Sequence, residues 1–427
     1  MTSKSEFAQL PNPSPKAPIF SWGKLIKLAL ASLLLIPLIH CQFPREIASH
    51  FRDCVRGGKD TTPLGAAIDV LTKFPVLDSH LDLPIALREE FGLDFAAFNL
   101  TTPTPSPFPM HIDFQRTRKG HLGSASFSSF VECPSPDSAD TSVRDTLEQL
   151  DTVFLLEEEY PDYIKIVRSA HELDTLSHRK LAVMLSLEGA HQLGDSLSAL
   201  RLYARLGIKY LTLAHNCDNV FADAAVEGQR SNGGLSDVGR ELVGELNRYG
   251  VLVDISHVSD ETAHQAIDIN KGPLFWSHSG ARAIYDHPRN VPDDLLVRLR
   301  DNPNDGVLQV VVAAADFMGD SPSLRDAADH IEHIASVAGK AHVGIGSDFD
   351  GVPTTPEGLE DISTYPALFA ELYKRGWTKA ELAGLARKNF IRVLKKAESV
   401  SRSLKRTSAP SMAVPPTRHD LLNNRGQ

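Results

Sequence analysis

Eight short apolar runs recur along the chain, and most of them are continuous stretches of valine, isoleucine and leucine. Runs of this kind are typical of strands that are buried on both faces, as in parallel sheets covered by helices. Most segments between them carry apolar residues at helical spacing, most clearly residues 237–249, which Gly250 follows as a candidate C-cap. The expected strands span residues 74–79, 124–131, 181–187, 208–214, 251–256, 273–277, 307–313 and 342–347.

This alternation predicts an α/β fold, a closed TIM-type (β/α)8 barrel over residues 65–398. An open doubly wound sheet is the alternative. Such a sheet usually has a glycine-rich phosphate-binding turn after its first strand, whereas this chain has Asp78-Ser79-His80 there. Further helices are expected over residues 195–206, 259–269, 292–300, 323–338 and 363–375.

Residues that commonly bind metals stand where six of the eight strands end. In a barrel of this kind these ends form one face, which carries the active site, so the side chains should converge. Imidazole nitrogens and carboxylate oxygens together are a zinc-type ligand set. Taken singly, each of them fits an ordinary hydrogen-bonded or turn-capping role, but burying all of them without a metal would be costly. The residues are His80, Asp82, Glu188, His215, His257, His278 and Asp348.

The segments around these residues resemble the membrane dipeptidase family, known also as renal dipeptidase. The resemblance covers roughly residues 65–398 and implies a zinc-dependent hydrolase of dipeptides, with two zinc ions per chain at the C-terminal ends of the barrel strands. The matching segments are 78–84 (DSHLDLP), 187–194 (LEGAHQLG), 210–223 (YLTLAHNCDNVFAD), 234–262 (GLSDVGRELVGELNRYGVLVDISHVSDET), 277–295 (SHSGARAIYDHPRNVPDDL) and 342–361 (HVGIGSDFDGVPTTPEGLED).

The resemblance also implies which residues bind the two metal ions. His80 and Asp82 match the ligands of one zinc, and His257 and His278 match those of the other. Glu188 matches the carboxylate that bridges both ions and is therefore counted among the catalytic residues as well.

Three further residues are implied to act on the substrate. His215 and Arg289 match substrate-binding residues, and Asp348 matches the acid of the last strand, with Asp350 as an alternative. Two zinc ions would share a water that ionises near neutral pH and attacks the scissile carbonyl. His215 would stabilise the oxyanion and Asp348 would carry the proton to the leaving amine, while Arg289 would bind the terminal carboxylate.

Two other functions fit the same residues. A related metal-dependent amidohydrolase could act on a specialised conjugate, such as a cysteinyl-glycine conjugate or a β-lactam-like amide. A non-catalytic binding protein on the same barrel would usually have lost ligands, and none of the five is lost here. The net charge of −10 argues against a nucleic-acid partner. Small dipeptides are the expected binding partners, and whether the chain also forms a homodimer is left open by the sequence.

The two ends of the chain are expected to lie outside the barrel. Residues 1–24 contain three lysines and one acid, and an apolar run follows within residues 25–41. This pattern predicts a cytosolic tail and a signal anchor, or alternatively a cleaved signal peptide, followed by a linker over residues 42–64. The catalytic domain would be lumenal or extracellular, or secreted after cleavage. Residues 399–427 are polar and contain prolines, which predicts a disordered tail.

Two covalent features agree with folding in the secretory pathway. Cys133 and Cys217 match a disulfide of the family, and Asn99 begins an Asn-Leu-Thr glycosylation sequon.

Overall fold

The computed structural model describes residues 62–103, 110–134, 141–176, 179–226, 230–312, 314, 317–319 and 321–422. The chain divides into two compact units, Met1–Lys59 and Asp60–Gln427. The expected cytosolic tail, the expected signal segment and nearly all of the expected linker therefore lie outside the described residues. In the described ranges, no helix is long and apolar enough to cross a membrane.

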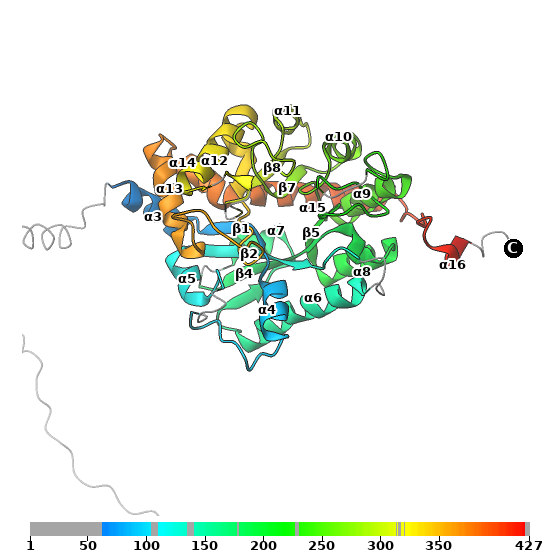
Figure 1. The fold of residues 1–427 in the computed structure, drawn as a ribbon, viewed down its shortest axis with the longest axis horizontal. Helices are drawn as coiled ribbons and strands as arrows, with labels where there is room; N and C mark the ends of the chain where they lie inside the picture. The colour runs from blue at the N-terminus through cyan, green and yellow to red at the C-terminus, as the bar shows by residue number, and fades with distance from the viewer. Residues whose placement is uncertain are drawn as a thin grey trace, which may run out of the picture. The chain divides into compact units, whose positions relative to one another are not determined.

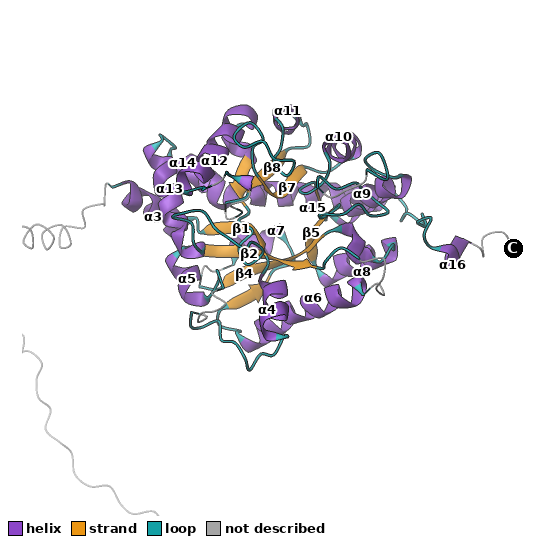
Figure 2. Cartoon of the chain, viewed as in Figure 1, coloured by secondary structure: helices purple, strands orange, loops and turns teal. Residues whose placement is uncertain are grey.

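Parallel strands form a closed barrel with helices around it (Figures 1 and 2). The strands are ordered β2-β1-β9-β8-β7-β6-β5-β4, and a pairing of β2 with β4 closes the ring. This confirms the predicted TIM-type barrel, with a strand at each of the eight expected places. The strands are β1 (Val76–Leu81), β2 (Leu122–Phe130), β4 (Leu181–Glu188), β5 (Ile208–Thr212), β6 (Leu252–Asp254), β7 (Leu274–Ser279), β8 (Gly306–Val310) and β9 (Val343–Ile345).

One short strand, β3 (Ile164–Ile166), was not expected from the sequence. It pairs with the first three residues of β4, while β5 pairs with β4 from Leu185 onward, so the two strands share one edge of β4. β3 extends this edge toward the N-terminal end of the barrel and contributes no residue to the opposite end.

The helices follow the predicted spacing closely. α9 covers Asp237–Tyr249, as expected, because Ser236 caps its N-terminus by accepting a hydrogen bond from Gly239 N and Gly250 ends it at φ 74°. The others are α3 (Pro63–Lys73), α4 (Leu83–Phe91), α5 (Phe114–Lys119), α6 (Ser142–Glu159), α7 (Ala170–Thr175), α8 (Leu197–Leu206), α10 (Asp260–Ile269), α11 (Asp293–Asp301), α12 (Leu324–Ala338), α13 (Tyr365–Lys374), α14 (Lys379–Ala383), α15 (Asn389–Thr407) and α16 (His419–Leu422).

Helix α15 corrects the expected end of the folded domain. It continues to Thr407, so residues 399–407 are helical and do not belong to a disordered tail. Tertiary contacts explain the difference, because Ser401 is buried and its hydroxyl donates to the carbonyl oxygen of Arg248 at the end of α9. Beyond the helix, Ser411 is held by Glu245 and Arg201.

The same helix closes the N-terminal end of the barrel. Phe390 of α15 packs edge-on against Phe275 of β7, with ring centroids 5.7 Å apart. Both rings belong to a buried apolar cluster that also contains Leu77 and Met184 from other strands. With this end filled by apolar side chains, the polar residues gather at the opposite end, where the strands finish.

Candidate active site

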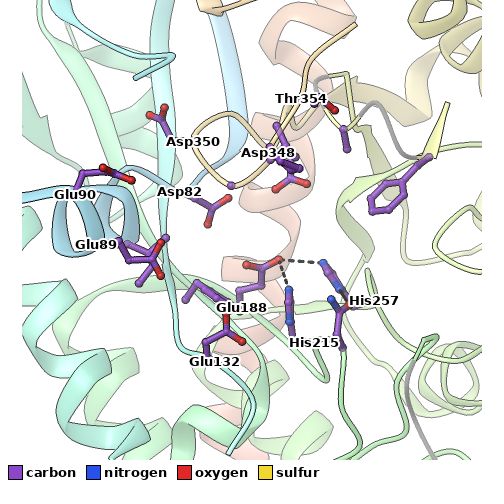
Figure 3. Close-up of a pocket in the computed structure, with 18 residues that line it drawn as sticks. Asp82, Glu89, Glu90, Glu132, Glu188, His215, His257, Asp348, Asp350 and Thr354 are labelled. Carbon is purple, nitrogen blue, oxygen red and sulfur yellow. Dashed lines mark hydrogen bonds and ion pairs between the residues drawn. The ribbon is translucent and has the colours of Figure 1, made fainter. Parts of the chain in front are cut away.

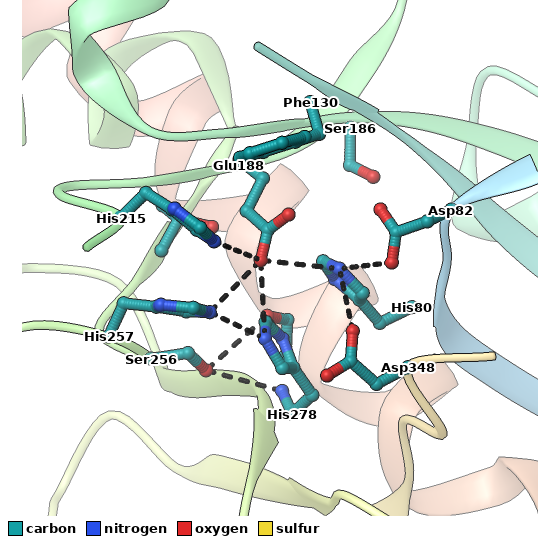
Figure 4. A network of polar contacts seen from close by, with 12 residues as sticks. His80, Asp82, Phe130, Ser186, Glu188, His215, Ser256, His257, His278 and Asp348 are labelled. Atoms are coloured by element: carbon teal, nitrogen blue, oxygen red, sulfur yellow. Dashed lines mark hydrogen bonds and ion pairs between the residues drawn. The ribbon is translucent and has the colours of Figure 1, made fainter. Parts of the chain in front are cut away.

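Glu188, the last residue of β4, lies at the centre of a cluster of histidines at the C-terminal ends of the strands (Figure 4). Its Oε1 atom is 3.0 Å from His257 Nε2, 3.2 Å from His278 Nε2 and 3.4 Å from His80 Nε2. His215 Nε2 lies slightly farther away, at 3.8 Å. Four imidazoles from four strand ends therefore converge on one carboxylate oxygen, as the sequence predicted.

Two aspartates complete the cluster beside His80. The Nε2 atom of His80 lies 3.3 Å from Asp82 Oδ2 and 3.8 Å from Asp348 Oδ1. Asp350 is engaged differently, since its Oδ1 accepts a hydrogen bond of 2.6 Å from the backbone of His111. Of the two acids after β9, it is therefore Asp348 whose carboxylate reaches His80.

The backbone turns sharply where these residues project from the strands. His257 and Asp348 have φ angles of 64° and 74°, a left-handed conformation that non-glycine residues rarely adopt. Glu188 is followed by Gly189 at φ 119°, where an added Cβ would lie 2.4 Å from the ring of His191. Local strain of this kind is common at functional sites, where packing holds side chains in place.

Neighbouring groups fix the orientation of three histidines. In each, Nδ1 is hydrogen-bonded outside the cluster, which leaves the Nε2 lone pair directed into it. The three pairs are His80 with the Tyr210 hydroxyl at 2.7 Å, His257 with Asn216 Oδ1 at 3.1 Å, and His278 with the Ser277 hydroxyl at 2.8 Å. Ser277 in turn donates to the carboxylate of Asp254 at 2.6 Å.

The donor atoms suit a divalent metal. Tetrahedral zinc bonds of about 2.0–2.1 Å place neighbouring donors roughly 3.3 Å apart, close to the separations around Glu188 Oε1. Asp82 stands at the N-cap of α4 but caps nothing, and neither of its oxygens, nor His80 Nε2, forms a hydrogen bond in the described part of the chain. The possible three-residue ligand groups are His80–Glu188–His278, Glu188–His215–His257 and His80–Asp82–Asp348.

Burial sets the protonation of the cluster. It lowers the pKa of His215 and of His278 to about 4, so both rings are neutral and can act as ligands at neutral pH. Burial, reinforced by the charges of Asp82 and Glu188, raises the pKa of Asp348 to about 6. A carboxyl group with a pKa in this range can both accept and release a proton near neutrality.

Arg289 is a buried cation beside the cluster. It is 4% exposed, and none of its guanidinium nitrogens has a hydrogen-bond partner among the described residues. The guanidinium lies over the ring of Phe317, 5.1 Å from its centroid. Burial lowers the pKa of Arg289 to about 10, so the group remains charged at neutral pH. A buried, unpaired guanidinium is suited to bind an anion.

A pocket of about 630 Å³ opens over the cluster (Figure 3). This volume is within the range of small-molecule sites, about 300–1,000 Å³. Asp82, Glu188, His215, His257 and Asp348 all line the pocket. The pocket is also lined by residues that the sequence pattern did not single out: Phe130, Phe317, Glu89, Glu90 and Glu132. For Glu89 and Glu90 the available signal was their place on the helix that directly follows Asp82.

The predicted disulfide between Cys133 and Cys217 is confirmed. It connects the segment after β2 with the segment after β5, which contains both His215 and Asn216. The side chain of Asn99, the predicted glycosylation site, is exposed and its Oδ1 accepts hydrogen bonds from Thr101.

Comparison with known proteins identifies the family of this chain. Residues 65–408 match the family described as membrane dipeptidase (peptidase family M19). An uncharacterized dipeptidase of Schizosaccharomyces pombe is 44% identical over 359 residues, 80% of this chain and 86% of the relative. The dipeptidase aclJ of Aspergillus oryzae is 36% identical over 414 residues, 95% of this chain and 96% of the relative.

Solved structures show the same fold. The crystal structure of dipeptidase AC, a metallopeptidase of this family, superposes with a TM-score of 0.67 at 25% identity, covering 76% of this chain and 98% of that one. The donor atoms at the strand ends are of the kind that binds metal ions, and the barrel fold and the sequence similarity point to the same family. The chain belongs to the membrane dipeptidase family, peptidase family M19, and is a metal-dependent dipeptidase.

Proposed function

We propose that the chain is a two-zinc dipeptidase that hydrolyses the single peptide bond of a dipeptide. The observation that carries this proposal is the position of Glu188, whose Oε1 lies within 3.4 Å of three histidine Nε2 atoms. His80 and Asp82 would bind one ion, His257 and His278 the other, and Glu188 would bridge them. Zinc ions in such a site act as Lewis acids and lower the pKa of coordinated water toward neutrality.

The remaining residues would position the substrate. Arg289 would bind its C-terminal carboxylate with two parallel hydrogen bonds, which its unpaired nitrogens support. His215 lines the pocket beside Glu188 and would contact the carbonyl oxygen as negative charge develops there. A carboxylate clamp at a fixed distance from the scissile bond would restrict the enzyme to very short peptides.

Asp348 would carry the proton. Its carboxylate lines the pocket and lies next to His80, and its pKa of about 6 allows it to accept a proton from the attacking water and pass it to the leaving amine. Asp350 would not take this part, because its backbone contact with His111 keeps one of its oxygens occupied.

A panel of free dipeptides tests the proposal, with product amino acids measured by chromatography and with Glu188→Gln as the matched inactive variant. Hydrolysis of several dipeptides that is lost in this variant supports it. Metal binding without hydrolysis of any dipeptide would favour the binding-protein alternative, and cleavage restricted to one conjugated amide would favour the specialised amidohydrolase.

We further propose that residues 25–41 direct the catalytic domain into the secretory pathway. The Cys133–Cys217 disulfide supports an oxidising compartment, and the exposed Asn99 is accessible to glycosylation. Glycosidase treatment of protein from secretory cells should increase its mobility, and Asn99→Gln should remove that shift. An unchanged mobility of the parent protein after glycosidase treatment would contradict this topology.

A further inference from the structure

Charge is distributed unevenly around the substrate pocket. Phe317 lines the pocket, and the guanidinium of Arg289 lies over its ring, 5.1 Å from the ring centroid. On the side of α4, the pocket is lined by three glutamates, here called the acidic wall: Glu89, Glu90 and Glu132. Figure 3 shows Glu89 and Glu90 on the opposite side of Glu188 from His257. Among the described residues that line the pocket there is no lysine or arginine.

The acidic wall has no partner in the described part of the chain. None of its three carboxylates forms a hydrogen bond or an ion pair with a described residue. The nearest cation along α4, Arg88, faces α6 instead, where it pairs with Asp145 at 3.0 Å and with Glu148. Partial burial raises the pKa of Glu89, and the negative charges of Glu132 and Glu90 add to this effect.

A second and independent feature lies on the same side of the pocket. The side chain of Asp350 is only 2% exposed, it lines the pocket, and its Oδ2 has no hydrogen-bond partner among the described residues. Asp350 Oδ1 is already engaged by His111, whose backbone N–H donates to it at 2.6 Å and whose Nδ1 lies 3.2 Å away. Burying the second oxygen without a hydrogen bond is costly, and a donor on a ligand would offset that cost.

The position of the wall matches one part of a dipeptide. If the C-terminal carboxylate binds Arg289 and the scissile carbonyl lies at Glu188, the N-terminal residue would extend away from Arg289, toward α4. Asp82 and Glu89 are separated by seven residues of continuous helix, on the order of 10 Å. A lysine side chain with its flexible four-carbon stem can extend from the scissile bond across much of this distance. Ile85, one turn before Glu89 on the same face, offers an apolar surface to that stem.

From this arrangement we propose that the pocket selects dipeptides whose N-terminal residue has a cationic side chain, lysine or arginine, through the carboxylates of the acidic wall and Asp350. The proposal rests on the proposed dipeptidase function and adds the substrate class. Acidic N-terminal residues would be repelled from the same surface.

The test compares lysyl-glycine with norleucyl-glycine. Both carry the same α-amino group and the same C-terminal residue, so the ratio of their kcat/KM values isolates the side-chain charge. Ion pairs at exposed positions contribute little individually, and the three exposed glutamates of the acidic wall together predict a ratio of about ten in favour of lysyl-glycine. The ratio should fall toward one at high salt, because exposed charges are screened.

Variants identify the source of the preference. In Glu89→Gln/Glu132→Gln the ratio should fall to about a third of the parent value or lower, whereas Glu158→Gln on the exposed face of α6 removes one charge outside the pocket and should keep the parent ratio. A parent ratio near one, or a ratio unchanged in the double variant, would overturn the proposal while leaving the dipeptidase function intact. Failure to cleave either substrate, or any other dipeptide, would instead contradict the proposed function itself.

Discussion

Replacing Arg289 with alanine removes the group that we expect to bind the C-terminal carboxylate of the substrate. Arg289 is 4% exposed and its guanidinium forms no hydrogen bond with a described residue, so the N–H donors are available to a ligand. A hydrogen bond between charged groups contributes about 1.5–3 kcal/mol, and two parallel bonds would contribute about 3–6 kcal/mol if they were additive. Water that fills the vacated space offsets part of this loss. We therefore expect a loss of about 3 kcal/mol, or roughly 100-fold in kcat/KM.

The assay compares a free dipeptide with its C-terminal amide in the parent, in Arg289→Ala and in Arg289→Lys. The parent should prefer the free acid about 100-fold, Arg289→Ala should hardly discriminate, and Arg289→Lys should lie between them because an ammonium lacks the planar fork. The melting temperature of Arg289→Ala should not fall, since the side chain makes no hydrogen bond within the described protein that would be lost. Equal discrimination between acid and amide in the parent and Arg289→Ala would refute the reasoning.

Other variants separate chemistry, positioning and stability. Asp348→Asn should lower kcat by about 10²–10⁴ with little change in KM in steady-state kinetics, because it removes the proton carrier. A raised KM with an unchanged kcat would show instead that this residue only binds substrate. Asn290→Ala should raise KM for free-acid dipeptides more than for amides, since Asn290 donates to the carbonyl oxygens of Tyr285 and Phe317 and so holds the loop under Arg289; an equal change for both would indicate a general structural defect. Replacing Cys133 and Cys217 with serine should lower the free energy of unfolding by about 3–5 kcal/mol in denaturant titrations, from the 84-residue separation that the bond closes; an unchanged midpoint would contradict this.

The barrel could be predicted from the sequence because its strands are buried on both faces and therefore appear as continuous apolar runs. Their ends were less predictable. The run at 251–256 predicted a longer strand than β6 (Leu252–Asp254), since the chain leaves the sheet before the left-handed turn at His257. Strand β3 has only three residues, Ile164–Ile166, which is too short for a clear periodic pattern.

The convergence of histidines and carboxylates at one end of the barrel could be predicted from the sequence, because these residues stand at or soon after the ends of the strands. The groups that orient the histidines, and the acidic wall, could not be predicted. Tyr210 lies inside β5 and looks like an ordinary core residue until its hydroxyl is found 2.7 Å from His80 Nδ1. Glu89 and Glu90 resemble the solvated face of any surface helix, and only the packing of α4 shows that they line the pocket. Similarly, the polar sequence around Ser401 concealed a helix that tertiary contacts stabilise.

The most direct test of the central claim is the metal content of the purified active protein, measured by elemental analysis beside that of Glu188→Gln. The account predicts about two zinc ions per chain in the parent, and loss of dipeptidase activity on chelation with recovery when zinc is restored. It also predicts weaker binding of both ions in Glu188→Gln, because this carboxylate lies between His80 and the pair formed by His257 and His278. Full dipeptidase activity in protein that contains no metal, or unchanged retention of two ions in Glu188→Gln, would contradict it.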